Sequence, residues 1–352
     1  MHQSKLAKNT FFSLLFRAIA IICGFILPRF ILNEFGTQVN GLVNSITQFL
    51  GIISFLELGM GAVVQSSLYK PLVDKDYIQI SRIASSAERF FKKIAAILCI
   101  YVIVLIIIYP YIAKQDFDFG YIALLIVIMS VGSFSEYYFG IVNSLLITAD
   151  QHGYIQYILQ IITLIINTVI SCILIYVGAS IHIVKLSTAI IYLIRPIILR
   201  IYVNKNYNID RKIRYTEEPI KQKWNGVAQH MSAVVLDGTD NIVLTIFSDL
   251  SNVSIYSVYN IVLSGVKQLM LSLTNGIQAL LGELWAKKDI ESLEKTFSWC
   301  EWCLHTITIF IFGCTGVLIV PFISVYTNGI TDANYIQPLF AILSQRLMPV
   351  TA

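Results

Sequence analysis

Charged side chains are scarce in this chain of 352 residues. Lysine, arginine, aspartate and glutamate make up 13% of it, whereas hydrophobic residues make up 56%. A soluble domain has about a quarter of its residues charged, so the composition excludes an ordinary soluble protein. Apolar runs of about twenty residues recur along the whole length, and each is long enough to cross a bilayer. The sequence therefore predicts an all-α polytopic membrane protein.

The sequence also lacks the motifs of several enzyme classes. It has no phosphate-binding loop, no metalloprotease helix motif and no nucleophile elbow. The pair Cys300 and Cys303 lies near His305, but no second pair completes a metal site. The first apolar run holds Arg17 and Arg29 and has no small-residue cleavage pattern, so a cleavable signal is not expected. We predict no cofactor and no nucleic-acid partner.

The apolar runs predict nine complete spans and the start of a tenth. They lie at about 10–32, 41–68, 94–113, 121–147, 154–177, 181–203, 224–247, 254–276, 296–326 and from 336 onward. Two of the connections, 69–93 and 204–223, are long and basic. With the N-terminus inside, nearly all loop lysines and arginines fall in inner connections, and the outer ones hold Lys114. This bias predicts a cytoplasmic N-terminus.

An internal repeat links the two halves of the chain. The stretch YPYI at 109–112 resembles VPFI at 320–323, and at nearly the same offset Asn40 matches Asn252. In transporters such repeats form two halves with the substrate path between them. We expect two six-span lobes related by pseudo-symmetry around a central cavity. The predicted divisions are an N-terminal lobe at 1–203, a basic cytoplasmic linker at 204–223 and a C-terminal lobe at 224–352. The second lobe stops after about three and a half spans, so we expect a truncated copy.

Several spans carry polar residues along one helical face. In the span at 254–276 these residues recur at three- and four-residue steps: Ser257, Asn260, Ser264, Lys267, Gln268 and Asn275. On a helix of 3.6 residues per turn they form one stripe. Similar stripes occur at 10–32, 121–147, 154–177 and 224–247. The neutral members either hold the helices together or line a polar internal volume.

Ionisable residues at or near membrane depth are the candidate site residues. They are Arg17, Arg29, Glu57, Glu136, Lys185, Arg195, Asp237, Asp240 and Lys267. Charges inside a bilayer are costly, so they mark function by default. Two interpretations stay open: structural ion pairs, or a cavity for a charged substrate or a proton relay. Side chains near a span end can also reach the membrane interface. An arginine in such a cavity suits a phosphate group.

Two stretches resemble a known family. They are GLVNSITQFLGIISFLELGMGAVVQSSLYKPLVDKD at 41–76 and LLITADQHGYI at 145–155. Both resemble Wzx-type polysaccharide flippases of the multidrug, oligosaccharidyl-lipid and polysaccharide exporter superfamily. The resemblance implies a bacterial inner-membrane protein of two six-span halves. By alternating access it would move an undecaprenyl-pyrophosphate-linked oligosaccharide to the outer leaflet for capsule, O-antigen or lipopolysaccharide synthesis.

The same resemblance implies partners and contact residues. The partners are the lipid-linked oligosaccharide, membrane lipids and the polysaccharide polymerase machinery. Arg17 and Lys267 are, by position, the candidates to meet the pyrophosphate.

Two other functions remain open. A small-molecule or drug exporter of the same superfamily fits the stripes, although Lys267 argues against a cavity for cations. A polytopic enzyme acting on lipid-linked sugars would need a sizeable outer loop for its catalytic side chains. The predicted outer loops are short, so we expect a transporter and not an enzyme.

Overall fold

The computed structural model describes residues 2–57, 59–113, 117–211, 213, 218–220, 227–286, 288 and 290–341. Every regular element in these ranges is a helix, as predicted. Lys114, the side chain of Asp237 and most of the predicted tenth span (342–352) lie outside the described residues. Six helical segments within the described ranges are long and apolar enough to cross a membrane. The chain is therefore a multi-pass membrane protein.

The chain divides into two compact units, Met1–Val253 and Ser254–Ala352, here called unit 1 and unit 2. The helices that lie wholly within unit 1 are α1 (His2–Gly51), η1 (Ile52–Glu57), α2 (Met60–Asp74), α3 (Tyr77–Ala113), α4 (Phe119–Ser135), η2 (Glu136–Gly140), α5 (Ile141–Ala149), α6 (Gly153–Tyr176), α7 (Ile181–Asn206) and α8 (Val227–Phe247). Helix α9 (Leu250–Ala286) begins at the end of unit 1 and continues into unit 2, which also holds α10 (Ile290–Tyr326). The predicted lobes at 1–203 and 224–352 rest on the sequence repeat and stay a prediction.

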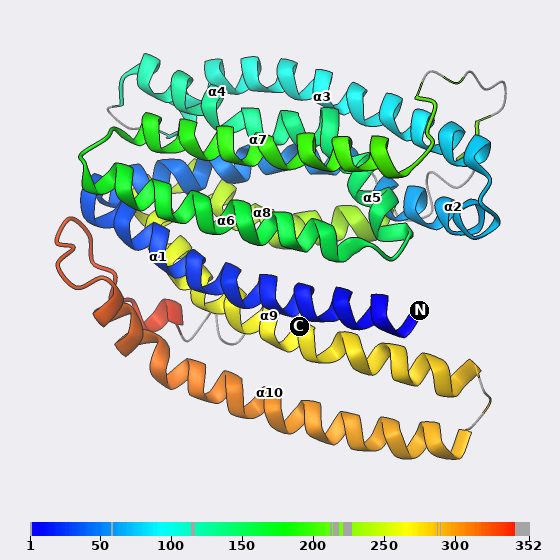
Figure 1. Ribbon diagram of the computed structural model, residues 1–352. Coiled ribbons are helices and arrows are strands. Elements are labelled where there is room, and N and C mark those ends of the chain that lie inside the picture. Colours follow the sequence, from blue (N-terminus) through cyan, green and yellow to red (C-terminus); the bar gives the residue numbers. More distant parts are fainter. Residues whose placement is uncertain are drawn as a thin grey trace. The chain divides into compact units, whose positions relative to one another are not determined.

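Gly36 divides α1 into two spans. Its backbone has φ 78° and ψ 176°, a conformation outside the helical region that glycine adopts without a steric penalty. Figure 1 shows the blue chain reversing its course between the two stretches of α1. The turn predicted at 33–40 is therefore present, but it is confined to one residue between two helical stretches.

The predicted span at 41–68 is not one helix. α1 ends at Gly51, the 3₁₀ helix η1 follows, and α2 begins after Gly59, whose φ is 69°. The connection predicted at 69–93 is helical almost throughout, because α3 starts at Tyr77. The Asp76 carboxylate caps that start by accepting a 2.9 Å hydrogen bond from the Gln79 amide.

Helix α3 is longer than a bilayer is thick. Its 37 residues span about 55 Å, against about 30 Å of hydrocarbon. Within the apolar stretch of this helix, Ile100, Ile103 and Ile107 are exposed on one face. The opposite face is buried through residues such as Leu98 and Leu105. A helix with apolar residues on both faces is suited to lipid on one side and a protein core on the other.

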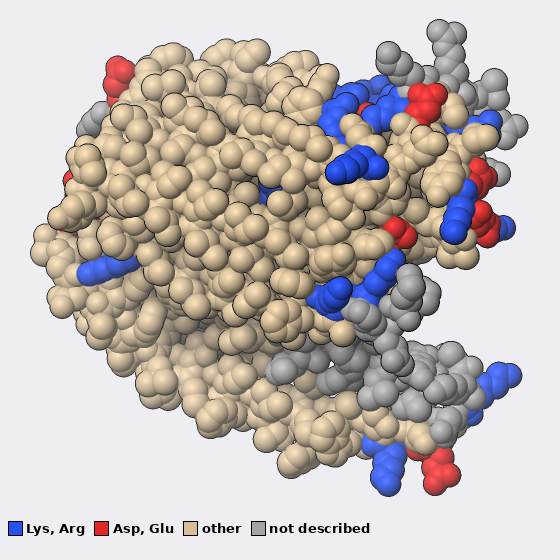
Figure 2. Space-filling model, in the orientation of Figure 1, with Lys and Arg blue, Asp and Glu red and all other residues tan. Residues whose placement is uncertain are grey.

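Exposed basic residues gather at one end of unit 1. They are Lys70, Lys75, Arg82, Arg89, Lys93 and Lys205, which belong to α2, the α2–α3 turn, the first turns of α3 and the last turn of α7. Figure 2 shows this end of the unit in blue and red, whereas the surface over the middle of its helices is tan. We call it the inner end, because the predicted cytoplasmic connections lie there.

The turn between α8 and α9 rests directly on the second half of α1. A Cβ atom at Gly41 would overlap the carbonyl oxygen of Leu250, so the two backbones are in contact. One turn further along α1, the buried hydroxyls of Ser45 and Thr245 share a 2.7 Å hydrogen bond. These contacts explain why α8 packs with α1, η1 and α3 in unit 1.

Unit 2 is held together by tyrosines that connect α9 to the segment after α10. The Tyr259 hydroxyl donates to the carbonyl of Tyr335 at 3.0 Å and accepts from the Gln337 amide at 3.0 Å. The Ser254 and Tyr335 hydroxyls lie 2.9 Å apart. Tyr259 and Tyr335 are both buried, so this segment belongs to the core of the unit.

Candidate functional site

Two irregular helical turns face each other inside unit 1. One is the 3₁₀ helix η1 in the second span, and the other is η2, a π turn between α4 and α5. In η2 the amide of Ile141 donates to the carbonyl of Glu136, five residues earlier. Turns of this kind inside a helix are frequent at functional sites. Each of the two turns carries one predicted glutamate, Glu57 in η1 and Glu136 in η2.

A hydrogen bond connects the two turns. The hydroxyl of Tyr137 in η2 donates to Oε1 of Glu57 at 2.6 Å. Glu136 lies next to Tyr137 in the chain, within electrostatic reach of both Glu57 and Arg195. Tyr137 is buried, and Glu57 and Glu136 are half-buried. The structure thus places two carboxyl groups from separate spans in one polar cluster.

Gly140 gives the π turn the space it needs. A Cβ at this position would lie 2.9 Å from the Cβ of Pro196 on α7 and 3.0 Å from the Glu136 carboxyl. The first separation is shorter than real Cβ contacts, and the second is tighter than most of them. Glycine at position 140 therefore allows α7 to pack against η2 and lets the Glu136 side chain lie over its own turn.

Arg195 on α7 supplies the cation of the cluster. Its guanidinium lies 5.2 Å from the centre of the Tyr192 ring, a cation–π contact, and its Nη2 lies 3.4 Å from the Thr163 hydroxyl. Thr163 and Asn167 are buried on the polar stripe of α6. Asn167 donates to the Tyr192 hydroxyl at 3.4 Å. The predicted stripe at 154–177 therefore faces Arg195 and its neighbours on α7.

The cluster holds polar atoms that are buried without a hydrogen-bond partner among the described residues. They are Nε of Arg195, Oε1 of Gln160 and Oγ of Ser135. Buried polar groups are normally paired, so each such atom needs an explanation, for example an internal water or a bound group. One is a donor, one an acceptor and one a hydroxyl that can be either. Each of these atoms could be satisfied by an internal water molecule or by a hydroxyl group of a ligand.

The charges of this cluster are unequal. Glu57 and Glu136 bring two carboxyl groups, and Arg195 brings one guanidinium. If both carboxyls are ionised, the three groups carry one uncompensated negative charge, which is costly inside an apolar bundle. A proton or a bound cation removes that cost.

The other predicted site residues are distributed over α1, α7, α8 and α9. Arg17 and Arg29 are half-buried on α1 and interact with other residues. Lys185 is half-buried one turn from the start of α7, and Asp240 is exposed on α8. Lys267 is half-buried on α9 in unit 2 and interacts with other residues. Only Glu57, Glu136 and Arg195 of the predicted set are thus shown together, and Asp237 lies outside the described side chains.

A second polar group closes the inner end of α5 and α6. The Asp150 carboxylate accepts a 2.6 Å hydrogen bond from the Tyr207 hydroxyl, and Nδ1 of His152 lies 3.0 Å from the same oxygen. Burial and the Asp150 carboxylate both raise the pKa of Tyr207 above its ordinary value. Asn9 of α1 binds the same turn through the Gln151 carbonyl and the Tyr154 amide. This turn lies within the stretch 145–155.

Two tyrosines that order the cluster, Tyr137 and Tyr192, were not among the predicted site residues. Tyr137 stands in the polar stripe of the predicted fourth span, beside Glu136, and that neighbourhood was the available signal. Tyr192 carries no such signal, since it lies in an apolar stretch and is recognised only through its contacts with Arg195 and Asn167.

Comparison with known proteins agrees with this architecture. No family model and no curated protein matches the chain. Several solved structures do match in fold, including the following two. One is described as the inward-facing conformation of a multidrug resistance MATE family transporter of the MOP superfamily. It has 12% identity and a TM-score of 0.55, and the match covers 96% of this chain and 82% of that one.

The other solved structure is a MATE protein in the bent conformation. It has 12% identity and a TM-score of 0.54, and the match covers 95% of this chain and 78% of that one. At this level of identity the likeness shows the fold alone. The chain is thus a helical multi-pass membrane protein. Its fold is that of the MATE transporters.

Proposed function

We propose that this chain is an inner-membrane transporter that moves undecaprenyl-pyrophosphate-linked oligosaccharide to the outer leaflet for surface polysaccharide synthesis. The observation that carries this proposal is the polar cluster of unit 1. An apolar bundle with this fold retains two glutamates, an arginine and unpartnered donors and acceptors at membrane depth. Such groups are costly in lipid, and transport of a polar substrate gives them a use.

The two stretches that resemble the flippases coincide with special features of unit 1. The stretch 41–76 contains η1 with Glu57, and the stretch 145–155 contains the turn of Asp150 and His152. The resemblance therefore falls on functional candidates and not only on apolar span residues. Lipid-linked sugars would present hydroxyl groups to the cluster, and the pyrophosphate would meet cations such as Arg17 and Lys267.

A small-molecule exporter is the second candidate, and one observation favours it. In the described cluster the carboxyl groups outnumber the guanidinium, which suits a cationic substrate or a coupling cation. One structure with the same fold is described as a multidrug resistance transporter. Under either proposal, the energy would come from an ion gradient or from the substrate's own gradient.

A transport assay separates the two candidates. The full chain would be reconstituted in liposomes with a lipid-linked oligosaccharide in the inner leaflet, and outward movement would be followed by lectin binding at the outer surface. In parallel, drug susceptibility would be measured in cells that express it. We expect lectin-accessible oligosaccharide to increase with the protein and not with the Arg195→Ala variant. Drug resistance without lectin accessibility would favour the exporter and overturn the flippase proposal.

A further inference from the structure

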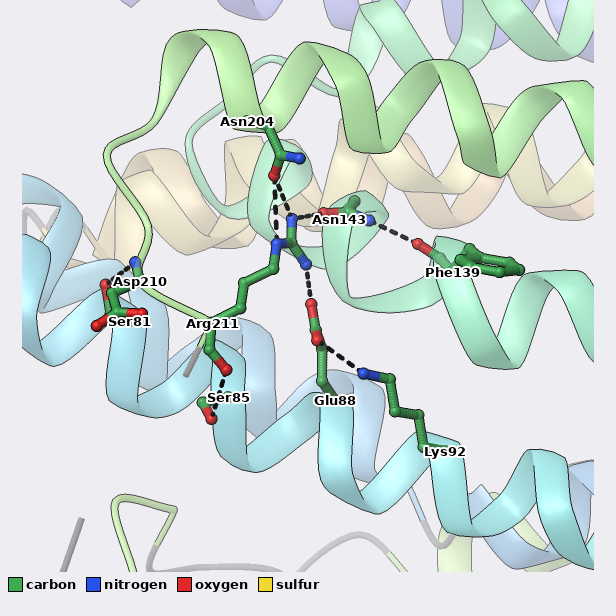
Figure 3. Close-up of polar contacts among 9 residues, drawn as sticks. All are labelled: Ser81, Ser85, Glu88, Lys92, Phe139, Asn143, Asn204, Asp210 and Arg211. Carbon is green, nitrogen blue, oxygen red and sulfur yellow. Dashed lines mark hydrogen bonds and ion pairs between the residues drawn. The ribbon is translucent and has the colours of Figure 1, made fainter. Parts of the chain in front are cut away.

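A buried polar network lies at the inner end of unit 1, outside the candidate site. Figure 3 shows Arg211, in the segment after α7, at its centre. The guanidinium forms an ion pair with Glu88 of α3. Its Nη2 donates to Oδ1 of Asn143 on α5 at 2.7 Å, and both Nη2 and Nε donate to Oδ1 of Asn204 on α7, at 3.0 and 3.2 Å. One side chain thus joins three helices.

The ion pair between Arg211 and Glu88 is largely shielded from solvent. The Arg211 and Glu88 side chains are 15% and 10% exposed. Burial lowers the pKa of Arg211 from its ordinary value, but a guanidinium still keeps its charge at neutral pH. A buried ion pair is tolerated when further hydrogen bonds satisfy both partners. The two asparagines and Lys92, which lies 3.3 Å from Glu88, provide them.

The backbone that carries Arg211 is fixed to α3. The Ser81 hydroxyl accepts from the Asp210 amide at 3.1 Å, and the Ser85 hydroxyl donates to the Arg211 carbonyl at 3.4 Å. The two serines stand one helical turn apart on α3, and both are buried. These bonds hold the Arg211 backbone beside α3, and from there the side chain reaches α5 and α7.

The network leads directly to the candidate site. The Asn143 side-chain oxygen accepts the hydrogen bond from Arg211. The side-chain nitrogen of Asn143 donates a second hydrogen bond, of 2.6 Å, to the carbonyl of Phe139. Phe139 belongs to η2, the π turn that carries Glu136. Asn204 belongs to α7, the helix that carries Arg195. Arg211 thus binds α7 directly and η2 through Asn143, and these two elements carry the opposite charges of the cluster.

We propose that Arg211 is a positioning residue for the candidate site. Through Asn143 it holds the π turn, and through Asn204 it holds α7, so that it fixes the placement of Glu136 relative to Arg195. Its importance for transport rests on the proposed function, whereas its effect on the Glu136 environment does not.

The environment of Glu136 is set by several described groups. Glu57 approaches from η1, Arg195 from α7 and Tyr137 from η2 itself. Two more cations contact η2 from neighbouring helices. Lys92 of α3 lies 5.4 Å from the Tyr138 ring centre, and Arg200 of α7 lies 5.6 Å from that of Phe139. A change in the placement of η2 or α7 alters these separations and hence the proton affinity of Glu136.

Infrared spectroscopy of the full chain in lipid nanodiscs tests the proposal. The carboxyl stretching band of Glu136 would be assigned with Glu136→Gln and followed as a function of pH, without substrate. We expect Arg211→Gln to move the midpoint of this band by about one pH unit. Asn143→Leu keeps the ion pair with Glu88 but removes the link to η2, and we expect a shift of the same sign. Lys93→Gln is the matched control, since it removes one positive charge from an exposed position of α3, whereas Lys92 itself contacts η2 through Tyr138.

The measured midpoints either support or overturn the positioning role of Arg211. A Glu136 midpoint that is unchanged in Asn143→Leu, or that moves equally in Lys93→Gln, overturns the positioning role. Should Arg211→Gln fail to fold, Asn143→Leu and Arg211→Lys carry the test, because lysine keeps the charge but lacks the planar fork that binds both asparagines. A shifted band in a protein that moves no oligosaccharide would leave Arg211 in its role and reject the proposed function.

Discussion

The hydroxyl of Tyr137 donates a 2.6 Å hydrogen bond to the carboxylate of Glu57, and this bond joins two spans at the points where each departs from α-helical geometry. Glu57 ends a 3₁₀ turn, and Tyr137 lies in a π turn. Neither turn has the regular i to i−4 backbone hydrogen bonds of an α-helix along its whole length. The contact between their side chains supplies some of the stabilisation that the backbone lacks.

Removal of the Tyr137 hydroxyl should therefore weaken unit 1. For Tyr137→Phe we expect a loss of stability on the order of 1 kcal/mol, because the half-buried carboxyl of Glu57 loses its donor. The thermal unfolding midpoint in detergent is the measurement. Tyr138→Phe is the control, since Tyr138 is the next residue and is 38% exposed. Equal midpoints for the two variants would mean that the Tyr137 hydrogen bond contributes nothing.

Gly140 offers a steric test of the same turn. Gly140→Ala would place a methyl group 2.9 Å from the Pro196 Cβ and 3.0 Å from the Glu136 carboxyl. We expect destabilisation of about 1 to 3 kcal/mol, as for other overpacked sites. Gly132→Ala in α4 is matched to it, because no neighbouring atom lies within 4 Å of the added methyl. A stable Gly140→Ala variant with unchanged transport would refute the tight packing of α7 on η2.

Glu136 should be needed for coupling and not for folding. In Glu136→Gln the cluster keeps its shape but can no longer exchange a proton at this position. We expect the variant to lose transport driven by a pH gradient and to retain a normal unfolding midpoint. Glu34→Gln removes an exposed carboxyl of α1 and serves as the comparison. Gradient-driven transport at the normal rate in Glu136→Gln would assign coupling to another group.

Tyr207 makes stability dependent on alkaline pH. Because its pKa in the folded protein is raised, the phenol contributes stability that is fully present below the unfolded value, which is about 10. That contribution is lost as the pH rises above this value, since the unfolded tyrosine then ionises. We expect the unfolding midpoint to fall more steeply above about pH 10 in the parent protein than in Tyr207→Phe. If the unfolding midpoints of the two proteins fell in parallel above about pH 10, the Tyr207 pKa would be the same in the folded and unfolded states.

Much of the fold could be predicted from the sequence, because apolar runs and loop charges report directly on membrane crossing. The helix breaks could not. Hydropathy along the second span is continuous through Leu56, so nothing in it distinguishes an α turn from a 3₁₀ turn. The local signal was the pair Gly59 and Gly61 beside Glu57, and only Gly59 adopts a left-handed backbone.

The candidate site was only partly accessible for a similar reason. Charges in apolar runs stand out, so Glu57, Glu136 and Arg195 were identified one by one. Their proximity depends on tertiary packing that no single stretch encodes. Arg211 is the clearest omission, because it lies in a basic connection that serves as a topology signal. Its role becomes visible only through Glu88, Asn143 and Asn204, which are distant from it or from one another in the chain.

The contact between Gly41 and Leu250 makes one position diagnostic for this architecture. Because a Cβ at position 41 would overlap the Leu250 oxygen, no side chain fits unless the backbone of the α8–α9 turn moves. A related chain with glycine here is compatible with the same turn on the same helix. A chain with any other residue must place that turn differently. The residue at position 41 in a related sequence thus indicates whether α8 and its following turn can pack on α1 in the same way.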